Sequence, residues 1–473
     1  MNAAQQPRPG STPRPPLDEL RDHLTGTVTV PGDPGYDDAR RVWNGMIDLR
    51  PAAVVRAGSV ADVDPVLGAV QHTGLPLAVR GGGHGVAGHG TVEDGIVLDL
   101  GGLRAVSVDP DSREVVVAPG ATLADVDAAT APHGLAVPLG VVSATGVAGL
   151  TLGGGVGWLT RTWGLALDSL LAADVVTGTR EHLHTSSVHN PDLFWGLRGG
   201  GGNLGVVTSF VFRARPLPAP VLTGTLVWAR EHWRSALHAF GRWSQELPDA
   251  MNPIVSFLRL PPEFGVGEDT VMLVAFAWAD PDHAAGLALV DRLRTAAPPD
   301  GEEIAPLPWP QWQSAMDGLF PTGSRGYWKN LSFAGPDERM LDALVAVAGE
   351  VDRAGTGIDL HLMGGFFGRV PEGTTAFPNR SAQLWLNVYG FWQDPAEDER
   401  LTAFARSAHA RLLPFADHGE YVNFLGAEGA PPGAEAARRS WGPEKHRLLA
   451  ELKLRYDPQN LLRRNHNVLP AAA

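Results

Sequence analysis

The sequence predicts an α+β fold in two parts, either two domains or one domain that carries a large insertion. The chain has 473 residues, which is more than one hydrophobic core usually supports. From about Val54 to Arg215, short β-branched runs alternate with short helical segments and clusters of glycine. After the proline-rich segment 216–220, longer helices alternate with strands in which apolar residues recur with a period of two.

The amino-acid composition limits the kinds of molecule that this protein is expected to bind. The formal net charge is −14 without a long basic run, which argues against nucleic acid and against an anionic membrane surface. There is no cysteine, so disulfides, thiolate nucleophiles and cysteine-ligated metals are excluded. Residues 1–19 are polar and rich in proline, and no later stretch reaches the roughly 18 apolar residues of a membrane span. We therefore expect a flexible N-terminal tail on a cytoplasmic protein that binds a small organic molecule.

The first predicted helix and strand lead to a glycine-rich loop. Ser59 and Asp62 form a capping-box start for a helix that Gly74 ends, and residues 76–80 then form a strand. The strand delivers the sequence Arg80-Gly81-Gly82-Gly83-His84-Gly85. Residues without a Cβ let the main chain approach a ligand closely and leave its amides free to bind anionic oxygens. His84 on such a backbone is a candidate nucleophile or ligand.

Two more glycine clusters follow, at 146–158 and 198–205. Three glycine loops in one part of the chain indicate a binding site rather than linkers alone. The predicted elements around them are a strand at 96–100, a hairpin formed by 105–108 and 114–118, a short helix opened by Thr122, and a strand at 170–177.

The second part is predicted to be an antiparallel sheet covered by helices. A helix over 231–247 carries a stripe of apolar residues at helical spacing, which is typical of a surface that faces a core. The stripe consists of Trp233, Leu237, Phe240, Trp243 and Leu247. The other expected elements are strands at 271–278, 358–363 and 383–391 and helices at 283–296, 338–354, 397–413 and 443–455.

The strand at 383–391 has two different faces. One face is aliphatic, and the other carries Gln383, Trp385, Asn387 and Tyr389. The polar and aromatic face either lines a pocket or is an ordinary solvent-exposed surface, since tryptophan and tyrosine are good strand residues in any setting.

Several motifs of known chemistry are missing or out of context. Gly83, Gly85 and Gly88 fit the dinucleotide fingerprint, but that loop must run into a helix, and residues 87–91 are a poor helix start. No Walker motif and no Gly-x-Ser-x-Gly occurs, which argues against nucleotide hydrolysis and α/β-hydrolase chemistry. Neither the pair His84 and His89 nor the histidines at 182–189 come with a recognisable ligand pattern, so we predict no metal site.

Four segments in this order resemble the berberine-bridge-enzyme-like FAD-linked oxidoreductases, members of the vanillyl-alcohol-oxidase superfamily with a PCMH-type FAD-binding domain. The resemblance extends from about Val42 to Pro470. Its segments are Arg80 to His84, Gly146 to Trp158, Gly200 to Thr208, and the terminal pair Tyr421-Val422-Asn423 and Tyr456-Asp457-Pro458-Gln459-Asn460.

The resemblance implies an FAD-binding domain built from both chain ends around an inserted substrate domain, whose antiparallel sheet covers the isoalloxazine ring. The implied boundaries are 1–19 for the tail, 20–216 for the FAD-binding domain, 217–426 for the substrate domain, and 427–473 for the segment that returns to the FAD domain.

The resemblance also implies roles for single residues. His84 matches the histidine bonded to the flavin 8α-methyl carbon, and the glycine loops match those whose amides bind the pyrophosphate. Thr145 matches a position beside the flavin that some relatives use to control oxygen access. The implied cofactor-binding residues are Arg80, Gly81, Gly82, Gly83, His84, Gly85, Thr145, Gly146, Gly149, Gly153, Gly154, Gly157, Gly202, Gly205, Val207, Tyr421, Asn423, Asn465 and Asn467.

One departure from the family pattern concerns the flavin bond. In bicovalent relatives a cysteine tethers flavin C6 in a Gly-x-Cys-Pro-Thr-x-Gly context, and here Val142 stands at its position. Because the chain has no cysteine, we expect FAD to be held by one covalent bond at most, through His84.

The other departure concerns the catalytic base. Sugar-oxidising relatives carry Tyr-x-Asn-Tyr and use the last tyrosine as base, but Phe424 has no ionisable proton. Tyr389 and Tyr421 are therefore the candidate catalytic residues, with Tyr327 and His361 behind them. An equal alternative is that Tyr421 and Asn423 only position the flavin.

The expected function is that of a flavin-dependent oxidase of secondary metabolism. It moves a hydride from a small, natural-product-like substrate to covalently bound FAD, and O2 then reoxidises the flavin and gives H2O2. Two alternatives stay open: a dehydrogenase that uses another electron acceptor, and a flavoprotein that binds a small molecule without oxidising it.

Overall fold

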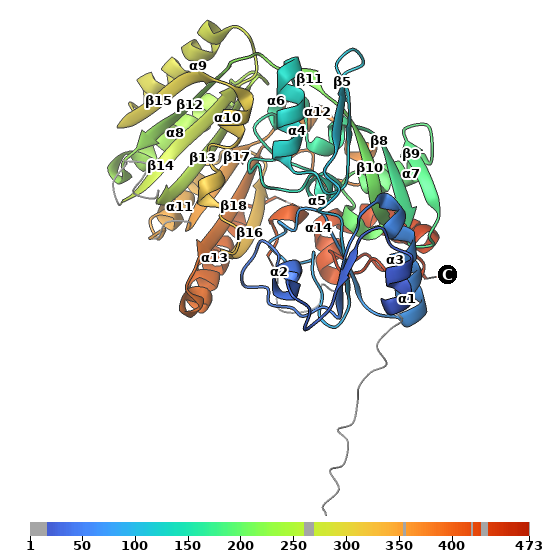
Figure 1. Cartoon of the computed structure of the whole chain (residues 1–473). Coiled ribbons are helices and arrows are strands. Elements are labelled where there is room, and N and C mark those ends of the chain that lie inside the picture. The colour runs from blue at the N-terminus through green and yellow to red at the C-terminus, as the bar shows by residue number, and fades with distance from the viewer. Residues whose placement is uncertain (1–16, 260–268, 353–355, 418–419, 427–433, 473) are drawn as a thin grey trace, which may run out of the picture.

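The computed structural model describes residues 17–259, 269–352, 356–417, 420–426 and 434–472. They form two bodies side by side (Figure 1). The first body contains the strands between residues 27 and 216 together with the C-terminal helix, and the second contains the strands between 221 and 392. This is the predicted α+β fold. None of the helices in the described ranges combines the length and apolar character that a bilayer span requires.

The first body contains a four-stranded sheet in which the last three strands are parallel. In spatial order these strands are β1 (Thr27–Thr29), β2 (Ala53–Arg56), β4 (Ile96–Asp99) and β3 (Leu77–Arg80). A five-stranded antiparallel sheet lies beside it, with the order β5 (Val106–Asp109), β6 (Glu114–Val117), β10 (Gly205–Arg213), β8 (Leu170–Thr177) and β9 (His182–Ser186). A short pair joins β7 (Leu135–Ala136) to β11 (Arg215–Pro216).

Short helices cover these sheets. They are α1 (Leu17–Asp22), α2 (Tyr36–Arg40), α3 (Val63–Thr73), α4 (Leu123–Thr130), α5 (Val147–Gly153), α6 (Thr160–Trp163) and α7 (Pro191–Leu197). The predicted capping box of Ser59 and Asp62 is present before α3, and Gly74 ends α3 with a left-handed φ of 68°. The last residues of the predicted tail, 17–19, begin α1, and residues 1–16 lie outside the described residues.

The chain returns to the first body at its end. Helix α14 (Ala434–Tyr456) is interrupted at Gly442, whose φ is 71°, so the predicted helix start at Pro443 corresponds to its second segment. Tyr456 is buried in the core that also contains strands β6, β8 and β10. The two ends of the chain therefore share one body, although the exact domain boundaries stay a prediction.

The second body is a seven-stranded sheet in which every pairing is antiparallel. Its spatial order is β15 (Gly301–Leu307), β12 (Val221–Trp228), β14 (Thr270–Trp278), β13 (Met251–Arg259), β17 (Thr356–Leu362), β18 (Leu384–Trp392) and β16 (Arg325–Phe333). Four helices share a core with one face of the sheet: α8 (Trp233–Ser244), α9 (His283–Ala296), α11 (Glu338–Ala348) and α13 (Asp398–Leu412). The short helices α10 (Trp309–Gln313) and α12 (Gly365–Arg369) complete this body.

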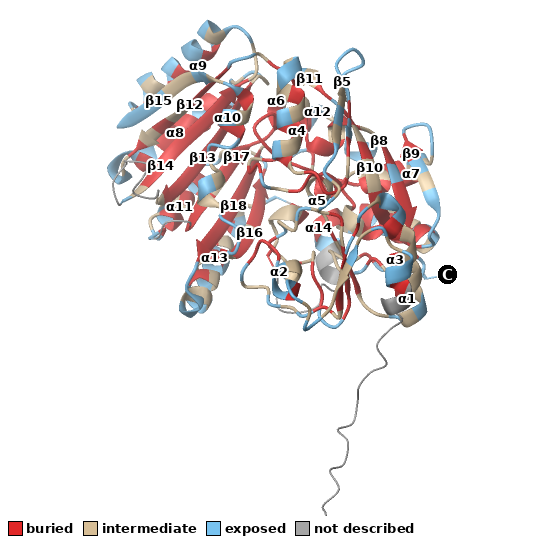
Figure 2. Cartoon of the chain, viewed as in Figure 1, coloured by how far each residue is buried: buried red, intermediate tan, exposed pale blue. Residues whose placement is uncertain are grey.

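In the second body, the structure confirms most of the predicted helices and strands and corrects some details. Trp233, Leu237, Phe240 and Trp243 are buried in the helix-covered core, whereas Leu247 lies beyond the end of α8 at Ser244 and is half-buried against the same core. However, α11 ends at Ala348 rather than Ala354, because Gly349 follows and glycine is a poor helix former. The solvent-exposed alternative for the polar and aromatic face of β18 is wrong, since every residue of β18 is buried and Figure 2 shows the central strands of this sheet mostly buried.

Candidate active site

A cavity of about 320 Å³ lies where the three glycine loops of the first body meet β16 and the C-terminal segment. This volume is in the range of small-molecule and cofactor sites. Helix η11 (Val422–Phe424) and residues 462–466 complete its wall. The predicted cofactor-binding residues that line it are Arg80, Gly81, Gly82, Gly83, His84, Gly85, Thr145, Gly146, Gly149, Gly153, Gly202, Gly205, Val207, Tyr421, Asn423 and Asn465.

Three predicted cofactor-binding residues do not line the cavity: Gly154, Gly157 and Asn467. A Cβ on Gly154, whose φ is 145°, would lie 2.8 Å from Cε2 of Tyr421. A Cβ on Gly157 would lie 2.0 Å from the carbonyl oxygen of Leu139. The two glycines let the loop pack against its neighbours, and direct contact with a cofactor stays a prediction for all three residues.

The first two glycine loops touch through their backbones. A Cβ on Gly82 would lie 2.6 Å from Cα of Gly146, and a Cβ on Gly146 would lie 2.4 Å from the backbone nitrogen of Gly82. Side chains at these positions would push the loops apart. Gly85 and Gly149 are different, because a Cβ there would meet nothing within 4 Å and both residues line the cavity. The loops thus form a cradle that presents backbone without a side chain to the cavity at Gly85 and Gly149.

His84 projects from this cradle with a free ring nitrogen. Its imidazole stacks on Trp43, with ring centroids 4.9 Å apart and an angle of 24° between the planes. Atom Nε2 is buried and has no hydrogen-bond partner among the described residues. Burial lowers the pKa of His84 to about 4, so the ring is neutral at physiological pH. A neutral imidazole with an unused nitrogen in a cavity has the chemistry of a nucleophile.

The cavity carries positive and neutral groups but no carboxylate among its described lining residues. Arg80 is used structurally, because its guanidinium donates to Asp99 and to two backbone carbonyls. Arg464 donates through Nε to the carbonyl of Thr91 at 3.0 Å, and burial lowers its pKa. Such a wall suits an anionic ligand that is bound largely by backbone amides.

Sequence reasoning missed Arg464, His89 and His466 as cavity residues. The rings of His89 and His466 pack edge to face with centroids 4.8 Å apart, and burial lowers the pKa of His89 well below its usual value. In the sequence, the only indication that Arg464 and His466 line the cavity is that they are adjacent to Asn465, which was predicted to bind the cofactor. Within the described residues, no three His, Cys, Asp or Glu side chains are grouped as a metal site requires.

A buried ion pair fixes the C-terminal segment to the third glycine loop. Lys453 and Asp457 are both fully buried, and Lys453 also donates to the carbonyls of Asn203 and Leu462 at 2.8 and 2.9 Å. Asp457 accepts hydrogen bonds from the backbone amides of Leu461 and Leu462 at 2.9 Å each. The terminal Tyr-Asp-Pro-Gln-Asn motif therefore holds the residues that carry Arg464 and Asn465 against the cavity.

Tyr421 and Asn423 connect η11 to the second glycine loop. The hydroxyl oxygen of Tyr421 accepts hydrogen bonds from the backbone amide of Gly155 at 2.8 Å and from Asn423 Nδ2 at 2.9 Å. Asn423 also donates to the carbonyl of Leu150 at 3.0 Å. Burial raises the pKa of Tyr421 to about 12, so the phenol keeps its proton at neutral pH. These contacts favour positioning over proton transfer as the role of Tyr421.

The other candidate bases belong to the seven-stranded sheet, and they lie on opposite faces of it. Tyr389 does not line the cavity; its hydroxyl donates to Asp359 Oδ1 at 3.2 Å, and burial raises its pKa well above the usual value. His361 lies on the same face of the sheet, and its ring is 5.8 Å from that of Phe424. Tyr327 is a correction, because it belongs to the helix-covered core on the opposite face, where its hydroxyl accepts a hydrogen bond from Arg406.

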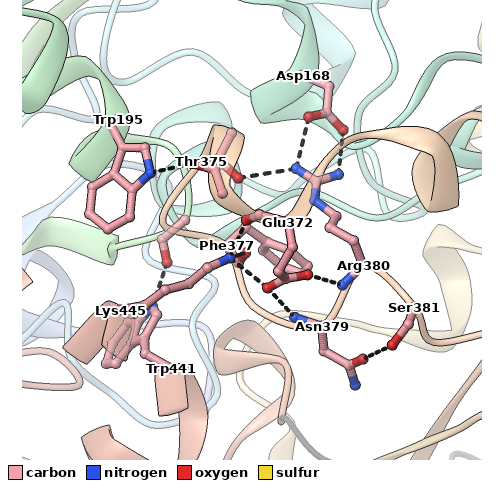
Figure 3. A network of polar contacts seen from close by, with 12 residues as sticks. Asp168, Trp195, Glu372, Thr375, Phe377, Asn379, Arg380, Ser381, Trp441 and Lys445 are labelled. Atoms are coloured by element: carbon pink, nitrogen blue, oxygen red, sulfur yellow. Dashed lines mark hydrogen bonds and ion pairs between the residues drawn. The ribbon is translucent and has the colours of Figure 1, made fainter. Parts of the chain in front are cut away.

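The loop between β17 and β18 is bound to the first body by a buried polar network (Figure 3). Arg380 forms two hydrogen bonds of 2.8 Å with Asp168, and both side chains are almost fully buried. Lys445 of α14 donates to the carboxylate and the carbonyl of Glu372 at 2.6 Å each, and to the carbonyl of Phe377. This network fixes the sheet above the cavity relative to the glycine loops.

Comparison with known proteins agrees with this geometry. A family model described as FAD binding domain matches residues 51–186. The (R)-6-hydroxynicotine oxidase of Paenarthrobacter nicotinovorans is 30% identical over 460 residues, which cover 94% of this chain and 97% of that protein.

Two solved structures show the same fold. The berberine-bridge-enzyme-like protein 1 of Physcomitrella patens has a TM-score of 0.85 at 21% identity, covering 97% of this chain and 99% of that one. A glucooligosaccharide oxidase of Acremonium strictum, which carries a 6-S-cysteinyl, 8α-N1-histidyl FAD, has a TM-score of 0.84 at 22% identity, covering 96% and 100%.

Proposed function

The chain belongs to the berberine-bridge-enzyme-like FAD-linked oxidoreductases, and on that premise we propose that it is an oxidase whose FAD is bonded to His84 and reoxidised by O2. The observation that carries the proposal is the unpartnered ring nitrogen of His84 inside a cradle of glycine backbone. A cavity with bare amides and Arg464, and without acidic residues in its described lining, fits the two phosphates of FAD.

The residues divide the work of holding FAD. The amides of the glycine loops and Arg464 would hold the anionic part, while Tyr421 and Asn423 keep the second loop in place through Gly155 and Leu150. The sheet of the second body, fixed by the network around Arg380, excludes water from the other side. When FAD is bound, it supplies the hydride acceptor for oxidation of a small organic substrate.

We expect one covalent bond rather than two. Val142 lines the cavity and is buried, and the sequence resemblance implies that it stands at the position of the cysteine of bicovalent relatives. The chain has no cysteine that can substitute for it. His84 is neutral near pH 7, which leaves its lone pair available for bond formation without prior deprotonation.

The same proposal assigns different roles to the two ends of the chain and to its middle segment. Residues 20–216 and 427–473 bind FAD, and residues 217–426 supply the substrate-facing sheet.

An anaerobic titration followed by air tests the proposed function. Purified protein is mixed without oxygen with alcohols, amines, and phenolic or polyketide-like compounds, and the flavin absorbance band is followed. A substrate should bleach the band, and readmitted O2 should restore it with about one equivalent of H2O2 per flavin. Bleaching that air does not reverse, but an artificial acceptor does, identifies a dehydrogenase instead; a band that no compound bleaches indicates a flavoprotein that only binds.

A further inference from the structure

A second pocket, of about 420 Å³, adjoins the first glycine loop, and we call it the outer pocket. The residues from Arg80 to His84 line both the outer pocket and the cavity described above. The rest of its wall comes from the end of α2 and the segment after it, from the ends of β2 and β4, and from Ala144 and Thr322. The two spaces therefore meet at the loop that carries His84.

The outer pocket is open to solvent. Four of its lining residues, Arg41, Arg56, Ala144 and Thr322, are exposed. A solute can therefore reach the His84 loop from this side without passing through the cavity that we assign to FAD. The volume is large enough for a small molecule or a complex ion.

The outer pocket has an excess of positive charge, although the formal net charge of the chain is −14. Arg80 forms an ion pair with Asp99 at 3.0 Å. Arg41 forms another with Asp38 at 2.6 Å. The side chain of Arg56 has no hydrogen-bond or ion-pair partner among the described residues, so one guanidinium is left for a ligand. Guanidinium groups bind anions by charge-assisted hydrogen bonds.

An aromatic pair lies between the two spaces. Trp43 lines the outer pocket but not the cavity, and it stacks on His84, which lines both. The indole nitrogen of Trp43 donates to the carbonyl of Phe320 at 3.1 Å, which fixes the ring. A hydride must be delivered by direct contact, whereas a single electron can pass between stacked rings. The outer pocket therefore suits a molecule that accepts electrons one at a time.

We propose that the outer pocket binds a small anionic one-electron acceptor beside His84 and Trp43, with Arg56 as its counter-charge. The inference rests on the proposed bond between FAD and His84 and adds a second route of reoxidation to the one through O2. One turnover removes two electrons and two protons from the substrate, so two acceptor molecules are reduced and two protons pass to water.

Binding of a redox-inert anion tests the site without turnover. Hexacyanocobaltate(III) has the charge and shape of ferricyanide but does not accept electrons from the protein. Calorimetry at low ionic strength, where screening is weak, should show one site per chain of the oxidised, flavin-containing protein. Arg56→Gln should weaken this binding by about five-fold, because it removes one charge near a trianion.

The matched control is Arg213→Gln. Arg213 is an exposed arginine on β10 that lines neither the cavity nor the outer pocket, and the substitution removes the same charge from the first body. Its affinity for hexacyanocobaltate should equal that of wild type. An equal loss in both variants would assign the binding to the overall charge of the chain and refute the site.

Electron transfer is measured by stopped flow. Protein reduced anaerobically with one equivalent of dithionite is mixed with ferricyanide or with neutral 1,4-benzoquinone, and the return of the flavin band is followed. The rate with ferricyanide should saturate and be inhibited competitively by hexacyanocobaltate. The ratio of the rate constants for ferricyanide and benzoquinone should fall by about five-fold in Arg56→Gln and stay unchanged in Arg213→Gln.

The inference is overturned if wild-type protein does not bind hexacyanocobaltate, if Arg56→Gln binds it as tightly as wild type, or if the ferricyanide rate rises linearly without inhibition. Flavin content, read from absorbance in the same samples, separates this result from failure of the proposed function. A preparation without flavin contradicts the proposed function, whereas full flavin content without anion binding contradicts the outer-pocket site alone.

Discussion

The contact between Gly82 and Gly146 predicts a sharp difference between two alanine substitutions in one loop. In Gly82→Ala the new Cβ would lie 2.6 Å from backbone atoms of Gly146, and ordinary contact needs about 3.4 Å. The loops must separate by about 0.8 Å, and rigid backbone rather than a flexible side chain has to move. We expect a loss of about 3 kcal/mol in the free energy of unfolding, at the upper end of overpacking costs.

Thermal unfolding and flavin content measure this effect together. Gly82→Ala should lower Tm by several degrees and reduce the flavin bound per chain, because the cradle itself is distorted. Gly85→Ala is the matched control, since its Cβ would meet nothing within 4 Å and its Tm should stay within about 1 °C of wild type. Equal Tm values for the two variants would show that the loops are not held by close backbone contact.

Three further predictions concern the buried Arg380–Asp168 pair, His361, and Val142 in the cavity wall. Asp168→Asn should cost about 3–5 kcal/mol in the free energy of unfolding, because it leaves the buried Arg380 without its carboxylate. Thermal unfolding measures this, and Glu451→Gln, which breaks the exposed pair of Glu451 with Arg447, should leave Tm unchanged. The buried His361 has a pKa of about 4 against 6.5 when unfolded, so between these values the unfolded chain binds the extra proton and stability falls as pH is lowered, by up to about 3 kcal/mol for this residue. Urea denaturation at several pH values should show this slope in wild type and a flatter one in His361→Gln. Val142→Cys should give a single thiol that maleimide labels in flavin-free protein but not in flavin-loaded protein, because Val142 lines the cavity; equal labelling would place position 142 away from the flavin.

Local patterns predicted the elements well because their signals are short-range. The capping box at Ser59, the left-handed Gly74 and the apolar stripe of α8 each depend on residues a few positions apart, and the structure confirms them. Helix ends were less predictable, as at Gly349, where propensity competes with packing.

The residues of the site could be predicted from the sequence where they lie in glycine clusters. Glycine clusters identified most of the cavity wall, but Arg464 and His466 enter it only because Lys453 and Asp457 fold the C-terminal segment back onto Asn203. No local pattern encodes that long-range contact.

The side chains that share one face of a strand could be predicted from the sequence, but the part of the molecule that covers this face could not. Alternation placed Trp385 and Tyr389 together, but whether water or another part of the chain covers them depends on how the two bodies meet. The same limit hid the link between Tyr389 and Asp359, which are 30 residues apart in the chain.

The central claim, one covalent bond between FAD and His84, is tested most directly by mass spectrometry of the denatured protein. The account predicts that the denatured chain stays yellow, that its mass exceeds the sequence mass by one FAD, and that the peptide containing His84 carries the adduct. His84→Ala should yield a colourless precipitate with any flavin in the supernatant. An unmodified wild-type chain, or an adduct on a peptide without His84, would contradict the claim.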